Sequence, residues 1–206
     1  DILSFGLGQR FEDTDISEQA AGYVPTVELY NKIYGTKGWK AITIRSLSIG
    51  QGEVLVTPLQ LANQAAAIAN KGYYITPHLN RNDSMKSRVH STLIDSIYFE
   101  VVQKGMERVM TNGTGRWYNV QDLQMCGKTG TVENVHGKDH ALFIGFAPKD
   151  NPQIAIAVAV ENAGFGATWA CPIGSLIMEQ YLTGEIKRKS LYDRIVNANL
   201  IAQDNE

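Results

Sequence analysis

The chain has 206 residues, of which 44% are apolar and 19% are charged, the composition of an ordinary globular protein with one sizeable core. Its formal net charge of −2 argues against a nucleic-acid partner, because a phosphate-binding surface needs an excess of Lys and Arg. The longest apolar run, Ile154 to Val160, is far shorter than the roughly 20 residues that a membrane-spanning helix needs.

The N-terminal part of the sequence predicts loops followed by a helix. Gly and Pro interrupt residues 5–8 and 21–26, so we expect loops over residues 1–40. Thr57 followed by Pro58 indicates a helix start, because a threonine hydroxyl caps the first turn and proline fits the first helical position. Apolar residues at helical spacing lead to Gly72, which is placed to end the helix. The many alanines of this segment predict close packing against another element.

A second helix is expected from about Ser96 to Met110. An apolar stripe on one side of it would face the core, and the glycines of residues 112–115 would end it. Helical spacing predicts that the stripe consists of Ile97, Val101, Val102, Met106 and Val109.

The last third of the chain has the pattern of strands. Two apolar runs at residues 141–147 and 154–160, separated by a proline-containing turn, predict an antiparallel hairpin. Residues 123–132 should form a third strand, and a final helix should run from Pro172 to about Leu182. Every second residue of the 154–160 run is Ala, so one face of that strand suits helices that pack closely against it.

These elements indicate an α+β fold in which an antiparallel sheet is flanked by helices. We expect one domain over residues 1–185 and a C-terminal tail over residues 186–206. The basic run Lys187, Arg188 and Lys189 would be a solvated part of that tail and not a binding patch.

The two cysteines, Cys126 and Cys171, have neither Cys-x-x-Cys spacing nor clustered histidines beside them. The pattern therefore predicts no zinc site, and no residue set suggests another metal or a cofactor. A disulfide between the two stays open, but the pattern favours two small buried apolar side chains.

The most informative feature of the sequence is the string Gly127-Lys128-Thr129-Gly130-Thr131. A phosphate-binding P-loop would need a further glycine at position 122 and a helix after the string. The chain has Asp122 there, and residues 132–137 have the pattern of a strand end and a turn. An acidic residue without a helix N-terminus disfavours phosphate binding, so we do not expect the string to bind a nucleotide.

The alternative is the Lys-Thr-Gly motif of serine acyl-transferases that react with penicillin. On a strand that borders a cleft, Lys128 would place a cation beside a reacting serine and a substrate carboxylate. Thr129 and Thr131 would offer hydroxyl groups to the same carboxylate. Gly130 lacks a Cβ atom, so an extended peptide can approach the strand and pair with its edge. The string by itself also fits an ordinary strand with two surface threonines, so its context must decide.

Short segments on both sides of the string supply that context. They are Phe5-Gly6-Leu7-Gly8, Gly22-Tyr23-Val24-Pro25, Gly50-Gln51-Gly52, Thr57-Pro58-Leu59-Gln60, Asn70-Lys71-Gly72, Gly113-Thr114-Gly115, Asp139-His140, Gly145-Phe146-Ala147-Pro148 and Val160-Glu161-Asn162-Ala163-Gly164. In order and spacing the chain resembles the class B penicillin-binding proteins, and within them the elongation-type penicillin-binding protein 2, from residue 1 to about Leu182. The resemblance implies part of a penicillin-binding or β-lactamase-like transpeptidase fold.

The resemblance also implies the activity of a peptidoglycan D,D-transpeptidase. In that reaction a serine attacks a D-Ala-D-Ala stem peptide, and an amine from a neighbouring strand resolves the acyl-enzyme into a cross-link. Lys128 and Thr131 would be catalytic, with the Thr131 N–H in the oxyanion hole, and Thr129, Gly130 and Thr131 would bind substrate. β-Lactam antibiotics would acylate the same serine. The family implies no cofactor, and it implies a membrane glycan polymerase of the elongation machinery as a partner of the parent protein.

The family's nucleophile lies in a Ser-x-x-Lys motif, and no serine of this chain has a lysine three positions on. Ser84 comes closest, with Lys86 two positions on, and the family's Ser-x-Asn motif is absent as well. Both motifs precede this region in the family, so we expect a C-terminal part of a longer protein that is inactive by itself. The parent would lie on the periplasmic face of the membrane, anchored by an upstream transmembrane helix. A chain that begins with Asp1 and not with Met fits a segment from inside a longer protein.

Two other classes of function stay open. One is a related serine enzyme of the same fold, a D,D-carboxypeptidase or a β-lactamase. The other is a non-catalytic module that binds cell-wall peptide or a partner protein. We expect His140 to be structural and Trp117 and Trp169 to belong to the core, because large aromatic side chains are more often buried than functional.

Overall fold

The computed structural model describes residues 1–81 and 88–201. Ser84 and Lys86, the nearest approach to the nucleophile motif, lie outside the described residues. The helices are η1 (Ile2–Phe5), α1 (Val27–Tyr34), η2 (Ser46–Ile49), α2 (Pro58–Ala69), α3 (Ser96–Thr111), η4 (Arg116–Tyr118), η5 (Gln121–Leu123), α4 (Ala170–Thr183) and α5 (Lys189–Val196), where η marks a short 3₁₀ helix. The strands are β1 (Tyr73–Ile75), β2 (Val89–Ser91), β3 (Cys126–Val132), β4 (His140–Ala147) and β5 (Ile154–Val160).

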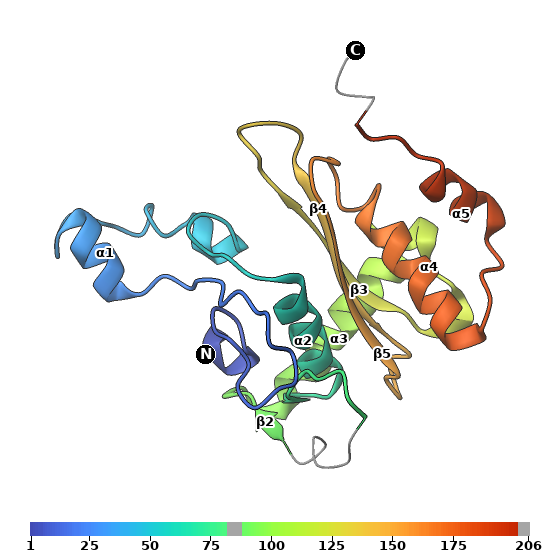
Figure 1. Cartoon of the computed structure of the whole chain (residues 1–206), viewed down its shortest axis with the longest axis horizontal. Helices are drawn as coiled ribbons and strands as arrows, with labels where there is room; N and C mark the ends of the chain where they lie inside the picture. Colours follow the sequence, from blue (N-terminus) through green and yellow to red (C-terminus); the bar gives the residue numbers. More distant parts are fainter. Residues whose placement is uncertain (82–87, 202–206) are drawn as a thin grey trace.

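An antiparallel three-stranded sheet with the order β3-β4-β5 forms the centre of the molecule. Gly130 of β3 lies opposite Leu142 of β4, and β5 pairs with β4 from Ile154 to Val160. Helices α2 and α3 cover one face of the sheet and α4 covers the other (Figure 1). The predicted α+β fold and its three strands are confirmed. Within the described residues β3 has a strand neighbour on one side only, so it forms an edge of the sheet.

The alternation of large and small residues on β5 matches the two helical layers. Its Ile and Val side chains pack on the α4 side, in the same core as Phe143 and Met178. Ala155 packs on the other side with Ile68 and Ala69 of α2. Small residues on both α2 and β5 let these elements approach closely, as the sequence predicted.

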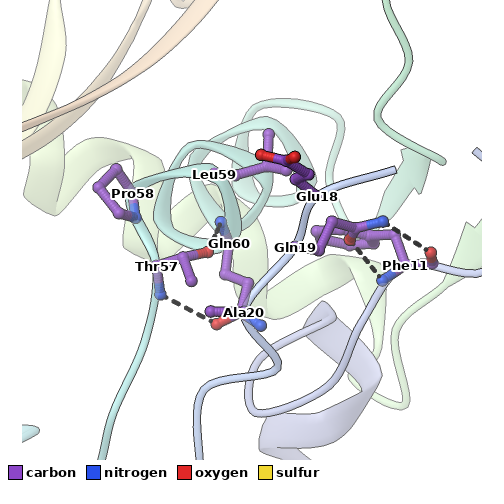
Figure 2. A pocket seen from close by; sticks show the side chains of 8 residues that line it. All are labelled: Phe11, Glu18, Gln19, Ala20, Thr57, Pro58, Leu59 and Gln60. Carbon is purple, nitrogen blue, oxygen red and sulfur yellow. Dashed lines mark hydrogen bonds between the residues drawn. The ribbon is translucent and has the colours of Figure 1, made fainter. Parts of the chain in front are cut away.

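Helix α2 begins at the predicted cap. Thr57 Oγ1 accepts a hydrogen bond from Gln60 N at 3.2 Å, and Gln60 Oε1 accepts one from Thr57 N at 3.1 Å, which forms a capping box (Figure 2). The buried Gln60 amide also donates to Gln9 O at 2.7 Å and Ala21 O at 2.8 Å. One side chain thus starts the helix and holds the N-terminal loops against it. Thr57 and Gln60 border a cavity of about 160 Å³ whose walls contain no residue of β3.

The predicted stripe of α3 is largely wrong. Ile97, Val101 and Val102 are exposed by 63%, 70% and 44%. The buried residues of this helix are Phe99, Gln103, Met106 and Met110. Apolar residues occur on two sides of α3, and the sheet selects the side that carries the aromatic ring and the methionines. A glutamine can lie on that side because its amide donates to two carbonyl oxygens at the end of α2.

An ion pair between the half-buried Arg188 and the buried Glu179 holds the chain after α4 against that helix. Arg188 Nε donates to Glu179 Oε2 at 2.9 Å, and its other nitrogens donate to Tyr118 O at 2.8 Å and Ser175 O at 3.1 Å. The expectation of a solvated basic run is therefore wrong for Arg188, because the Glu179 side chain, only 3% exposed, needs a cationic partner. Helix α5 follows beside α4 (Figure 1). A domain boundary at residue 185 stays a prediction.

None of the helices in the described ranges is both long and apolar enough to cross a membrane.

Candidate active site

The predicted string lies on edge strand β3 and borders a cleft. Lys128, Thr129, Gly130 and Thr131 line one wall of a cavity of about 570 Å³. The other walls come from η1, the segment around η2 and the start of α2. Their lining residues include Ile2, Leu7, Ile49, Gln51, Val54, Leu61 and Gln64. The structure thus brings the four predicted site residues together on one surface that is open to a ligand.

Successive side chains of β3 point to opposite faces of the sheet. Met125, just before the strand, packs in the core on the α4 side, whereas Cys126 packs in the core on the α2 and α3 side. By alternation Lys128 lies on the α2 side with Cys126, and its side chain is exposed. Thr129 and Thr131 lie on the α4 side with Met125. The cation and the two hydroxyl groups therefore leave the strand in opposite directions.

The polar atoms of the string already have partners in the protein. Lys128 Nζ donates to Thr129 O at 2.6 Å. The Thr129 hydroxyl lies 2.8 Å from the Thr114 hydroxyl, which belongs to the turn after α3. Thr131 Oγ1 accepts from Gly166 N at 3.4 Å. A ligand carboxylate would have to compete for, or share, these hydroxyl groups.

The backbone of Thr131 faces the cleft. Gln51 Nε2 donates to Thr131 O at 3.5 Å, and Gln51 lines the cleft on the side of β3 opposite to β4. The N–H and C=O of one residue in an extended strand point to the same side, so the Thr131 N–H also points toward the cleft. The sequence singled out Gln51 only through the resemblance, because a contact between segments so far apart leaves no local signal.

Gly127, the first residue of the string, is needed for packing in the core. A Cβ atom at Gly127, Gly145 or Gly174 would lie less than 3.0 Å from the ring of Phe143, a separation that real Cβ atoms do not adopt. Phe143 is fully buried, so its ring fills the space that these three glycines leave open. Gly127 is therefore explained by packing, independently of any role in chemistry.

His140, Trp117 and Trp169, which the sequence predicted to be structural, lie in three different places. His140 Nδ1 accepts from Asn162 N at 3.0 Å, which ties the start of β4 to the turn after β5 and fits a structural role. Trp169 is half-buried against the core on the α4 side, as expected. Trp117 is 77% exposed, with the Arg116 guanidinium 4.8 Å from its ring centre, so the core expectation is wrong for Trp117. The cavity walls contain none of these three side chains.

Both cysteines are buried and free, as the sequence favoured. Burial raises the pKa of the Cys126 and Cys171 thiols to about 12. Because the thiolate is the reactive form, neither is a candidate nucleophile. Over residues 1–81 and 88–201, no group of three His, Cys, Asp or Glu side chains is arranged to hold a metal ion.

Comparison with known proteins places the chain in a family. A family profile described as the penicillin binding protein transpeptidase domain matches residues 3–179. The peptidoglycan D,D-transpeptidase MrdA of Acinetobacter baumannii is 34% identical over an alignment of 194 positions, which covers 82% of this chain and 28% of the relative. The protein of the same name in Haemophilus influenzae is 31% identical over an alignment of 221 positions, which covers 93% of this chain and 33% of the relative. The chain therefore spans only about a third of the length of these curated relatives.

The fold is also that of a solved relative. The crystal structure of Pseudomonas aeruginosa PBP2 in complex with WCK 5153 matches with a TM-score of 0.77 and 35% identity, over 91% of this chain and 43% of that chain. The family profile covers most of the sequence, including the β3 string and the sheet around it. The chain thus belongs to the penicillin-binding transpeptidase family and is similar to its PBP2 members.

Proposed function

We propose that this chain supplies the Lys-Thr-Gly wall of the active site of a peptidoglycan D,D-transpeptidase that β-lactams acylate. The observation that carries the proposal is the position of Lys128 to Thr131 on an exposed sheet edge that borders a cavity of about 570 Å³. An exposed edge can pair with an extended peptide through its backbone, which suits a D-Ala-D-Ala stem peptide.

The reaction needs a serine from a Ser-x-x-Lys motif in the parent protein, outside this chain. The serine oxygen forms a bond to the penultimate carbonyl carbon, the C–N bond to the terminal D-Ala breaks, and that residue leaves with a proton. The amine of a second stem peptide then attacks the ester, which forms the cross-link and releases the serine. β-Lactams stop the cycle at the acyl-enzyme.

Lys128, Thr129, Gly130 and Thr131 each take part in this proposal. Lys128, which is exposed and lines the cleft, supplies a cation beside the serine and takes part in proton transfer. The Thr131 N–H points into the cleft and stabilises the oxyanion, where one donor typically contributes about 3–4 kcal/mol. Gly130 leaves room for the peptide backbone, and the hydroxyl groups of Thr129 and Thr131 bind the substrate carboxylate.

The setting of the parent protein is part of the same proposal. An upstream transmembrane helix would hold the domain at the periplasmic face of the membrane, where stem peptides are found. A membrane glycan polymerase of the elongation machinery would supply the strands to be cross-linked. No nucleic acid and no cofactor is required.

The test compares this chain with the long form that includes the upstream part of the parent gene, by intact mass spectrometry after incubation with penicillin. We expect one penicillin adduct on the long form and none on this chain. In the long form Lys128→Ala should slow the adduct by roughly 100-fold or more. Lys104→Ala, which removes an exposed lysine of α3, is the matched control and should leave the rate unchanged.

The outcomes separate the alternatives. No adduct on the long form would contradict the proposal and favour a module that only binds cell-wall peptide. An adduct that forms and then hydrolyses within seconds would favour a D,D-carboxypeptidase or β-lactamase of the same fold. A stable adduct supports the transpeptidase.

A further inference from the structure

The loop between β5 and α4, residues 161–169, lies directly against the Lys-Thr-Gly strand. Gly166 N donates to Thr131 Oγ1 at 3.4 Å. A Cβ atom at Gly166 would lie less than 3.0 Å from Gly130 O and from Leu142 O, which real Cβ atoms do not approach so closely. Only glycine fits this position without a shift, because the loop backbone touches the paired backbones of β3 and β4.

The contact of Gly166 with β3 is made at the peptide group that joins Gly130 to Thr131. Gly130 O and the Thr131 N–H belong to the same planar peptide group and point in opposite directions. Gly130 O faces β4 and Gly166, and the Thr131 N–H faces the cleft. Any displacement of Gly130 O by the loop therefore turns the N–H that the proposed reaction uses as an oxyanion donor.

The loop is fixed by elements on both sides. Gly164 N donates to Asp139 O at 2.7 Å, and Cys171 N donates to Gly166 O at 2.9 Å. These bonds join the loop to the start of β4 and the start of α4. The contact point therefore has little freedom to move independently of the sheet.

Helix α5 also contacts this loop. The Arg194 guanidinium lies 5.6 Å from the ring centre of Trp169 and 5.9 Å from that of Tyr118, and it donates to Thr168 O at 3.4 Å. Helix α5 begins at Lys189, beyond residue 179, where the match to the family profile ends. A segment outside the matched domain thus contacts the loop that carries Gly166.

We propose that Gly166 and Arg194 are positioning residues for the active site. Gly166 sets the orientation of the Gly130–Thr131 peptide group, and Arg194 holds the loop in place from α5. The inference rests on the proposed function, because the orientation of the Thr131 N–H matters only if that group receives the oxyanion.

The test uses the full-length parent protein and measures the β-lactam acylation rate constant at saturation separately from the apparent affinity. Gly166→Ala should lower the saturating rate constant by roughly tenfold or more, as weakening an oxyanion donor does, with a smaller change in affinity. Arg194→Met should lower it by about two- to fivefold, the range that one exposed cation–π contact allows. Arg194→Lys keeps a cation over the rings and should recover part of that rate.

Two matched controls separate positioning from general damage. Gly105→Ala places a methyl group in open space on α3, and Lys189→Met removes an exposed cation at the start of α5. Both should leave the rate constant unchanged. If Gly166→Ala does not fold, Arg194→Met decides the matter, because it leaves the loop glycine in place.

The results distinguish this inference from the proposed function. A wild-type saturating rate constant in Arg194→Met, or in folded Gly166→Ala, would overturn the corresponding positioning role while the transpeptidase proposal stands. No acylation of the wild-type parent would overturn the proposed function itself.

Discussion

At the scale of single residues, buried amides connect segments that are far apart in the chain. The Gln60 amide donates to Gln9 O and Ala21 O, and the Gln103 amide donates to Ile68 O and Ala69 O at 2.8 and 3.0 Å. Each glutamine is almost fully buried, which is tolerable because its polar atoms are satisfied. Each side chain joins distant segments through hydrogen bonds inside the protein, a role that the polarity of glutamine alone does not suggest.

The buried cysteines give a prediction about reactivity and pH. Cys126 and Cys171 should not react with iodoacetamide at pH 8 in the native protein and should both react in urea. Burial raises their pKa from an ordinary value of about 9 to about 12. The unfolded thiols therefore ionise first, so their contribution to stability is complete below pH 9 and declines from there toward pH 12. Rapid labelling of native protein, measured by mass spectrometry, would contradict this.

At the scale of elements, strand β4 and helix α4 fit together around one ring. The side chain of Phe143 occupies the space above Gly127, Gly145 and Gly174. Three elements therefore meet at a distance that only glycine permits. The interior is close-packed, so a single added carbon has no free space to enter.

Gly174→Ala should destabilise the protein by about 1–3 kcal/mol, because the added methyl group collides with the Phe143 ring. Helix propensity alone predicts the opposite sign. Gly105→Ala is the matched control, since a Cβ there meets open space and should stabilise α3 by up to about 1 kcal/mol. Urea unfolding of the two variants measures both effects. Equal shifts in the two variants would show that packing at Phe143 does not decide the outcome.

The ion pair between Arg188 and Glu179 of α4 gives a second prediction at this scale. Arg188→Met should cost about 3–5 kcal/mol of unfolding free energy, because it leaves the buried Glu179 carboxylate without its cation. The double variant Arg188→Met with Glu179→Leu should recover much of the loss, since no buried charge remains. Lys187→Met, at an exposed neighbouring position, should be close to neutral. A double variant as unstable as the single one would argue against the ion pair as the cause.

At the scale of the whole molecule, residues 26–53 form an arm that projects from the body (Figure 1). The arm has a small core of its own, in which Tyr30 lies 5.7 Å from Tyr34 and 5.5 Å from Trp39 between ring centres. The Tyr30 hydroxyl donates to Glu53 Oε2 at 2.6 Å, and this bond raises the pKa of Tyr30 to about 12. The arm also carries Gln51 to the cleft, so its position bears on the site.

Hydrogen exchange should separate the arm from the body. Amides of α1 should exchange through local opening, faster than those of α2 and α4, because α1 lies outside the two main cores that cover the sheet. Exchange followed by mass spectrometry of peptic peptides resolves the three helices. Protection of α1 equal to that of α4 would contradict the expected local opening.

The sequence by itself determined the features that depend on neighbours along the chain. The Thr57 cap, the 141–160 hairpin and the placement of the Lys-Thr-Gly string on a strand all follow from local spacing and residue type. Lys128 to Thr131 lie together on the cavity wall because they are consecutive on one strand. Their catalytic roles stay predictions.

Only the tertiary structure decided which distant segments meet. It decided which side of α3 is buried, and it placed the half-buried Arg188 beside Glu179. It also brought Gln51 and Gly166 to the two sides of Thr131. Local periodicity reports that a face is apolar but not what covers it. Contacts across the fold depend instead on how several elements pack at once, and that information is spread over the whole chain.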